Sequence, residues 1–147
     1  MSREIKFRAW DSDQKRMLKV YRISFDGPTE GAQAHCYLDD RGAEGSKKFF
    51  YFYDGDGLTL EQFTGLKDKN GKDIYEGDIL AWHSNIYRKH DWVGLVLYRG
   101  AGFAVQESDK SYSSPEWLDC ACRKDANIIE VIGNVHDNPE LLEAQND

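Results

Sequence analysis

Membrane-spanning and secretory signals are missing from this sequence of 147 residues. No apolar run approaches the roughly 20 residues that a transmembrane helix needs. The stretch MSREIKFRAW at the start lacks the apolar core of a signal peptide. Cysteine is scarce too, and the 3 cysteines do not show the paired spacing of disulfide-rich secreted proteins. We therefore expect a protein of a reducing cytoplasm that has no membrane partner.

The spaced motifs of catalytic and metal sites are also missing. The sequence has no H-E-x-x-H or H-x-x-E-H motif, no G-x-S-x-G motif and no phosphate-binding glycine loop before a helix. Cys120 and Cys122 are separated by a single residue, whereas structural zinc sites use gaps of two to four residues. An acidic stretch that begins at Asp68 places Lys72 where a calcium loop needs a ligand. We expect no metal and no cofactor.

Positive charge is in deficit, because 19 lysine and arginine residues stand against 26 aspartate and glutamate residues, for a net charge of -7. A chain with this balance lacks the basic surface that binds duplex DNA or RNA. The densest basic spots are Arg88-Lys89 and the pair Lys6 and Arg8, which strand alternation places on one face. We interpret Arg88 and Lys89 as candidate binding residues on a largely solvated surface, with nucleic acid less favoured than protein as the partner.

Glycine-containing turns divide the segment from Thr64 to Trp82, TGLKDKNGKDIYEGDILAW, into short apolar runs. Asn70-Gly71 is the strongest short hairpin signal, and it predicts a type I′ turn with a positive φ at both residues. Gly77 and Asp78 lie in a second predicted turn, where glycine can take a positive φ. The segment thus predicts three short strands joined by two tight turns, as in an antiparallel meander.

The same segment resembles a known family. FTGLKDKNGKDIYEGDIL, from Phe63 to Leu80, is nearly identical to YTGLKDKNGKEIYEGDIV, the hallmark of the YopX-like family of phage and prophage proteins. IKFRAWD, from Ile5 to Asp11, resembles the start of that family, and IEVIGNVHDNPELL, from Ile129 to Leu142, resembles its end. The resemblance implies a β-rich accessory protein that works in the cytoplasm of the host bacterium, and it carries over no catalytic residue.

Period-2 alternation and turn residues recur along the chain and predict a mainly β fold built from antiparallel hairpins. We expect the segment from Ile74 to Val105 to form a small SH3-like barrel, packed with a second sheet from the N-terminal hairpin and an aromatic strand. Ser114-Pro115 predicts a short helix, and Asn138-Pro139 predicts a C-terminal helical turn. We interpret 1–147 as a single domain, with 1–58 and 59–147 as possible subdomains.

Five consecutive aromatic residues, Phe49-Phe50-Tyr51-Phe52-Tyr53, form the most unusual run of the chain. In a strand, Phe50 and Phe52 point to one face, and Tyr51 and Tyr53 point to the other. We predict that the two phenylalanines lie in the core and that the two tyrosines form a contact surface, because tyrosine suits half-wet interfaces. Together with an aromatic content of 13%, this run favours an interaction module that binds a host or phage macromolecule, a protein first, or a second copy of the chain.

Two other functions stay open. A nucleic-acid-associated SH3-like module fits the expected barrel, although the net charge opposes it. A small hydrolase is consistent with loop histidines and aspartates that converge in space. The residues of that hypothetical site are His83, His90, His136, Asp78, Asp91 and Asp137.

Overall fold

A computed structural model describes residues 4–25, 32–37, 49–53, 57–83, 91–107, 111–123 and 127–143. These residues form antiparallel strands and two short helices, which confirms the mainly β class. The chain divides into two compact units, Met1–Gln62 and Phe63–Asp147. No helix in the described ranges is long and apolar enough to cross a membrane.

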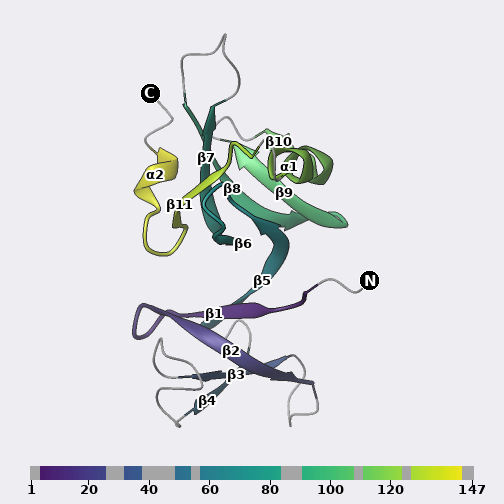
Figure 1. Ribbon diagram of the computed structural model, residues 1–147. Helices are drawn as coiled ribbons and strands as arrows, with labels where there is room; N and C mark the ends of the chain where they lie inside the picture. The colour runs from purple at the N-terminus through teal and green to yellow at the C-terminus, as the bar shows by residue number, and fades with distance from the viewer. Residues whose placement is uncertain are drawn as a thin grey trace. The chain divides into compact units, whose positions relative to one another are not determined.

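The first unit is an antiparallel sheet in which the strands follow the order β4-β3-β2-β1-β5 (Figure 1). Its strands are β1 (Phe7–Asp11), β2 (Arg16–Ser24), β3 (Gln33–Tyr37), β4 (Phe49–Tyr53) and β5 (Leu58–Lys67). The hairpin predicted from alternation at the N-terminus is β1–β2, with Ala9 opposite Leu18. β5 belongs to both units, because its first half pairs with β1 and its second half pairs with β6 (Asp73–Tyr75).

Small and branched side chains fill one face of this sheet. The members of this first core are Ala9, Leu18, Ala34, Cys36 and Leu58, with Val20 and Leu60 packed against them. Register places Phe50 opposite Cys36 and Phe52 opposite Ala34, so both phenylalanine positions lie beside buried members of the core. The side chains of β4 lie outside the described ones, and the burial of Phe50 and Phe52 stays a prediction.

The second unit contains a sheet in the order β10-β9-β8-β7-β11. Its strands are β7 (Asp78–His83), β8 (Asp91–Arg99), β9 (Gly102–Glu107), β10 (Tyr112–Ser113) and β11 (Glu130–Asn134). A turn at Gly100 joins β8 to β9, where Arg99 lies opposite Gly102. Helix α1 (Pro115–Ala121) begins as predicted, because the Ser114 side chain accepts a hydrogen bond from the Trp117 N–H.

The core of the second unit lies between this sheet, the β5–β6 hairpin and α1. Its buried members are Ile74, Leu80, Trp82, Val96, Val105, Leu118, Ala121 and Ile129. Gly94 on β8 permits the close packing, since a Cβ there would collide with Val105 and Trp82. The predicted C-terminal helical turn is α2 (Glu140–Glu143), where the Leu141 N–H donates to the Asn138 carbonyl at 3.1 Å.

The expected meander through β5, β6 and β7 is wrong in one respect. β6 pairs with β5, whereas β7 pairs with β8 and β11. The turn at Gly77 therefore carries the chain from one sheet into the other, and Ile74 and Leu80 enter the same core from two layers. Within the described residues neither sheet closes on itself, so the closed SH3-like barrel is not confirmed.

Candidate functional site

The β5–β6 hairpin holds most of the segment that the sequence singled out. Gly71 has a φ of 81°, but Asn70 does not have a positive φ, so the predicted type I′ turn is wrong. The Gly71 N–H donates to the Asp68 carbonyl at 2.9 Å, and the Asp68 N–H donates to the Lys72 carbonyl at 2.8 Å. This pattern is that of a three-residue loop, a type I turn followed by a left-handed glycine.

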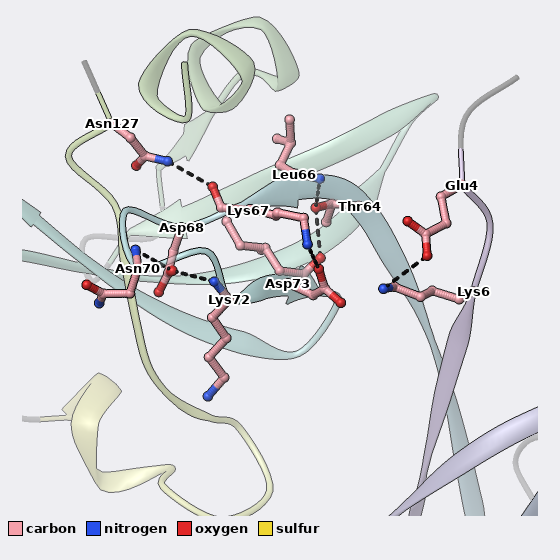
Figure 2. Close-up of polar contacts among 11 residues, drawn as sticks. Glu4, Lys6, Thr64, Leu66, Lys67, Asp68, Asn70, Lys72, Asp73 and Asn127 are labelled. Atoms are coloured by element: carbon pink, nitrogen blue, oxygen red, sulfur yellow. Dashed lines mark hydrogen bonds and ion pairs between the residues drawn. The ribbon is translucent and has the colours of Figure 1, made fainter. Parts of the chain in front are cut away.

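The Asp68 side chain explains why the longer loop forms. This carboxylate is only 5% exposed. Its Oδ1 accepts from the Asn70 and Lys72 N–H groups at 2.9 Å each, as Figure 2 shows. Its Oδ2 accepts from the Val131 N–H, also at 2.9 Å, and thereby ties the hairpin to β11. One carboxylate thus accepts from three backbone donors.

Two other polar side chains of the second unit hold backbone in place. The Asn127 amide donates to the Lys67 carbonyl at 2.8 Å and to the Cys122 carbonyl at 3.3 Å (Figure 2 shows the first bond). Asp78 is buried, and its Oδ2 accepts from the Tyr75 N–H at 2.8 Å across the turn at Gly77. These contacts stabilise turns and connections, and they need no ligand.

A cleft of about 480 Å³ opens beside the hairpin turn, within the size range of small-molecule pockets. Its lining residues are Gly65, Leu66, Lys67, Asp68, Lys69, Gly71, Cys122 and Asn127. Both of its lysines are matched by carboxylates, with Lys67 Nζ 2.8 Å from Asp73 and Lys69 Nζ 3.6 Å from Glu130. Both lysines of the cleft are therefore paired with carboxylates, and the third charged residue of its lining, Asp68, accepts from backbone N–H groups.

A different surface lies on the sheet of the first unit, on the face opposite its core. We call it the tyrosine face and define it by Lys19, Tyr21, Arg22, His35 and Tyr37. The Tyr21 and Tyr37 ring centroids lie 4.7 Å apart, and the Tyr21 ring meets His35 edge-on at 6.1 Å. A register shift between Val20 and Arg22 leaves Tyr21 as the extra residue of a bulge, and Arg22 pairs with His35. The bulge brings Tyr21 and Arg22 to the same face.

His35 is 5% exposed and is held by its neighbours on this face. Its Nε2 lies 3.2 Å from Ser24 Oγ, and the Ser24 hydroxyl donates to Gln33 Oε1 at 3.0 Å. Whether the ring nitrogen donates to the Ser24 hydroxyl or accepts from it depends on the tautomer of His35. In both cases the contact fixes the orientation of the imidazole ring.

Of the three thiols, Cys36 is buried, Cys122 is half-buried and Cys120 is exposed. Burial raises the pKa of the Cys36 thiol from 9.0 to about 11, and the negative charge of Asp11 adds to the rise. Burial likewise raises the pKa of the Cys122 thiol to about 11, with Asp119 and Asp68 adding to it. Both thiols are protonated at neutral pH, which makes them weak nucleophiles. Among the described residues, no group of three or more His, Cys, Asp or Glu side chains is placed to hold a metal ion.

Comparison with known proteins identifies the family. The model of the YopX protein family matches residues 6–143. The chain belongs to the YopX family. A solved structure, that of protein EF1440 from Enterococcus faecalis, is 30% identical and has a TM-score of 0.63, over 96% of this chain and 99% of that chain. No curated protein matches the chain. The family resemblance carried by the segment from Phe63 to Leu80 is therefore confirmed.

Three of the four residues predicted to form turns lie in turns of this YopX protein. Asn70 and Gly71 lie in the β5–β6 turn, and Gly77, with a φ of 85°, lies in the turn before β7. Asp78 is the first residue of β7, and its side chain accepts a hydrogen bond from the Tyr75 N–H across that turn. Tyr51 and Tyr53 lie on β4, but their side chains are outside the described ones. Arg88 and Lys89 fall in the range 84–90, which is also outside the described residues.

The hypothetical hydrolase site cannot be assembled from the described residues. His90 and the side chain of His83 lie outside them. His136 is described, and its backbone N–H donates to Asn134 Oδ1 at 2.9 Å, in the turn after β11. The convergence of the three histidines stays a prediction.

Sequence reasoning missed the tyrosine face. In KVYR, from Lys19 to Arg22, strict strand alternation would place Lys19 and Tyr21 on one face and Val20 and Arg22 on the other. The sequence alone predicts neither the bulge after Val20 nor the pairing of β2 with β3. Without them, nothing in the sequence brings Tyr21 against Tyr37.

Proposed function

We propose that this YopX protein is a phage or prophage interaction module that works in the host cytoplasm and pairs its strand β4 with a strand of another protein, a second copy of itself first. The observation that supports this function is the position and composition of β4. In the part of the chain that the structure describes, β4 ends the order β4-β3-β2-β1-β5-β6. Phe49–Tyr53 contains neither a charge nor a proline, the residues that usually protect an edge strand from pairing.

The sequence of β4 favours a second copy of the chain as the partner. A two-fold axis at Tyr51 pairs Phe49 with Tyr53 and Phe50 with Phe52, so that every cross-strand pair is aromatic. Aromatic cross-strand pairs contribute roughly 0.2–1 kcal/mol each. Such an isologous contact extends the sheet across two chains and uses the backbone groups of both edges.

Register also supports a contact role for the tyrosines of this strand. Tyr51 lies opposite His35, and Tyr53 lies opposite Gln33, on the strand that also carries Tyr37. Tyr51 and Tyr53 therefore occupy positions on the tyrosine-rich side, away from the core face. Arg88 and Lys89 stay the second candidate contact, and an SH3-like barrel stays our proposal for the second unit.

Analytical ultracentrifugation of the full chain tests this function. Tyr51→Lys places two ammonium groups at the two-fold axis, so we expect the dimer to dissociate while the circular dichroism of the monomer is unchanged. Tyr51→Phe keeps the aromatic pair and should keep the dimer. Tyr98→Lys, at a tyrosine of the second unit that is 55% exposed, is the matched control and should also keep it. An unmodified protein that stays monomeric at every concentration would overturn the proposal of self-association.

A further inference from the structure

Two exposed cations of the tyrosine face have no acidic partner among the described residues. Lys19 and Arg22 are exposed, and neither forms an ion pair with any residue that the structure describes. Their neighbour Arg8, opposite Lys19 in register, differs, because its Nε lies 2.9 Å from Glu61 Oε1 and both side chains are largely buried. The face thus carries local positive charge in a chain with a net charge of -7.

The two cations flank a ring surface. Tyr21 is 41% exposed, lies on the same face as Lys19 and packs against the half-buried Tyr37. His35 contacts the Tyr21 ring edge-on, and its own contact with Ser24 holds it in place. Ordered, partly exposed rings of this kind accept a second planar group by stacking.

We infer that the tyrosine face binds single-stranded nucleic acid, an activity beyond the proposed self-association through β4. Unpaired bases supply the planar groups that stack on Tyr21 and Tyr37, and the phosphodiester backbone supplies the anions for Lys19 and Arg22. An acidic peptide would satisfy the cations but would leave the rings without a matching group. A duplex keeps its bases stacked internally, and its higher charge density is repelled by the acidic chain.

The number of free cations sets the expected salt dependence. Each phosphate contact with a single strand contributes about 0.7 to the slope of log affinity against log salt concentration, so two contacts predict a slope of about -1.4. Fluorescence anisotropy with labelled oligothymidine and oligouridine, at a series of potassium chloride concentrations, measures this slope. We expect both single strands to bind and a duplex of the same length to bind more weakly.

Variants separate the stacking contribution from the ionic one. Tyr21→Ala should weaken binding by roughly 5- to 150-fold, the range for one lost base–aromatic stack, and Tyr21→Phe should restore it. Lys19→Ala combined with Arg22→Ala should reduce the salt slope to near zero. Lys72→Ala removes one exposed lysine of the second unit and is the matched control for lost charge, with affinity and slope unchanged. Circular dichroism of each variant establishes that its fold is retained.

Several outcomes overturn this inference. Failure of the unmodified protein to bind either oligonucleotide does so directly. Equal competition by polyglutamate would show that the cations serve an acidic protein instead. A duplex that binds as well as the single strands, or Tyr21→Ala with unchanged affinity, would show that base stacking plays no part. None of these results depends on whether Tyr51→Lys changes the oligomeric state.

Discussion

At the scale of single residues, Gly71 decides the β5–β6 turn through its backbone conformation. No heavy atom lies within 4 Å of a Cβ built on Gly71, so a side chain there meets no steric obstacle outside its own backbone. The cost of a substitution is therefore conformational, and a left-handed residue with a Cβ loses roughly 1–2 kcal/mol. We expect Gly71→Val to lower the free energy of unfolding by at least this amount, measured by urea denaturation.

Gly71→Asn is the matched comparison, because asparagine tolerates the left-handed region better than a β-branched residue does. It should lower the free energy of unfolding by less than Gly71→Val does. Equal losses for the two variants would contradict the conformational explanation, and an unchanged stability of Gly71→Val would contradict the turn itself.

The raised pKa values of the Cys36 and Cys122 thiols predict a loss of stability in alkaline solution. The folded-state pKa of Cys36 and of Cys122 is raised from 9.0 to about 11, mainly by burial. Above pH 9.0 the unfolded chain loses these protons before the folded chain does, so the stabilisation present below pH 9.0 is lost as the pH rises toward 11. Urea denaturation across this range should show a falling free energy of unfolding.

Because other groups also titrate in this range, variants must isolate the contribution of the thiols. Cys36→Ala combined with Cys122→Ala should make the decline less steep. Cys120→Ala, which removes an exposed thiol, is the matched control and should leave the decline unchanged. The prediction fails if the double variant and the control show the same pH dependence.

At the scale of elements, local signals in the sequence predict strands and caps better than they predict partners. Alternation gives β1 and β2, Ser114-Pro115 gives the start of α1, and the glycine at position 77 gives the turn into β7. β7 pairs with β8 and β11 instead of β6, so that β6 and β7 bury side chains in one core from two layers. A short window of neighbouring residues does not reveal such a pairing. The Asp68 side chain that holds the turn at Asn70 also accepts from the Val131 N–H, a contact between residues far apart in the chain.

Asp68 links two elements that are far apart in the chain, so its substitution should affect more than its own turn. Asp68→Asn keeps the size of the side chain but replaces one acceptor oxygen by an NH₂ donor. At least one of the three backbone donors loses its acceptor, at a cost of roughly 1–3 kcal/mol for a buried unsatisfied group. We expect a fall of this size in urea denaturation and faster hydrogen exchange at Val131 as well as in the hairpin.

Asp73→Asn is the matched control for Asp68→Asn. Asp73 lies in the same hairpin, and this substitution removes its negative charge from a surface ion pair with Lys67. Such pairs contribute roughly 0–1 kcal/mol to stability. If both variants lose the same stability, or if exchange at Val131 does not change in Asp68→Asn, the carboxylate does not join the hairpin to β11.

At the scale of the whole molecule, the family motif and the proposed functional surfaces lie in different units. The motif lies mainly in Phe63–Asp147, where its polar groups satisfy one another. Both proposed surfaces lie in Met1–Gln62, on β2, β3 and β4. The segment that carries the family motif therefore contributes to the fold of the second unit, and the proposed surfaces arise from the pairing of β2, β3 and β4.

The division of β4 into a core side and a contact side predicts opposite results for neighbouring aromatic residues. Phe52 lies opposite the buried Ala34, and Tyr51 lies opposite His35 on the tyrosine-rich side. Phe52→Ala should therefore lower the free energy of unfolding by roughly 3–5 kcal/mol, as for a buried phenylalanine. Tyr51→Ala should leave the monomer folded and reduce the mass measured by light scattering. If both variants lose stability alike and the mass does not change, both faces of β4 are covered within one chain and the contact surface lies elsewhere.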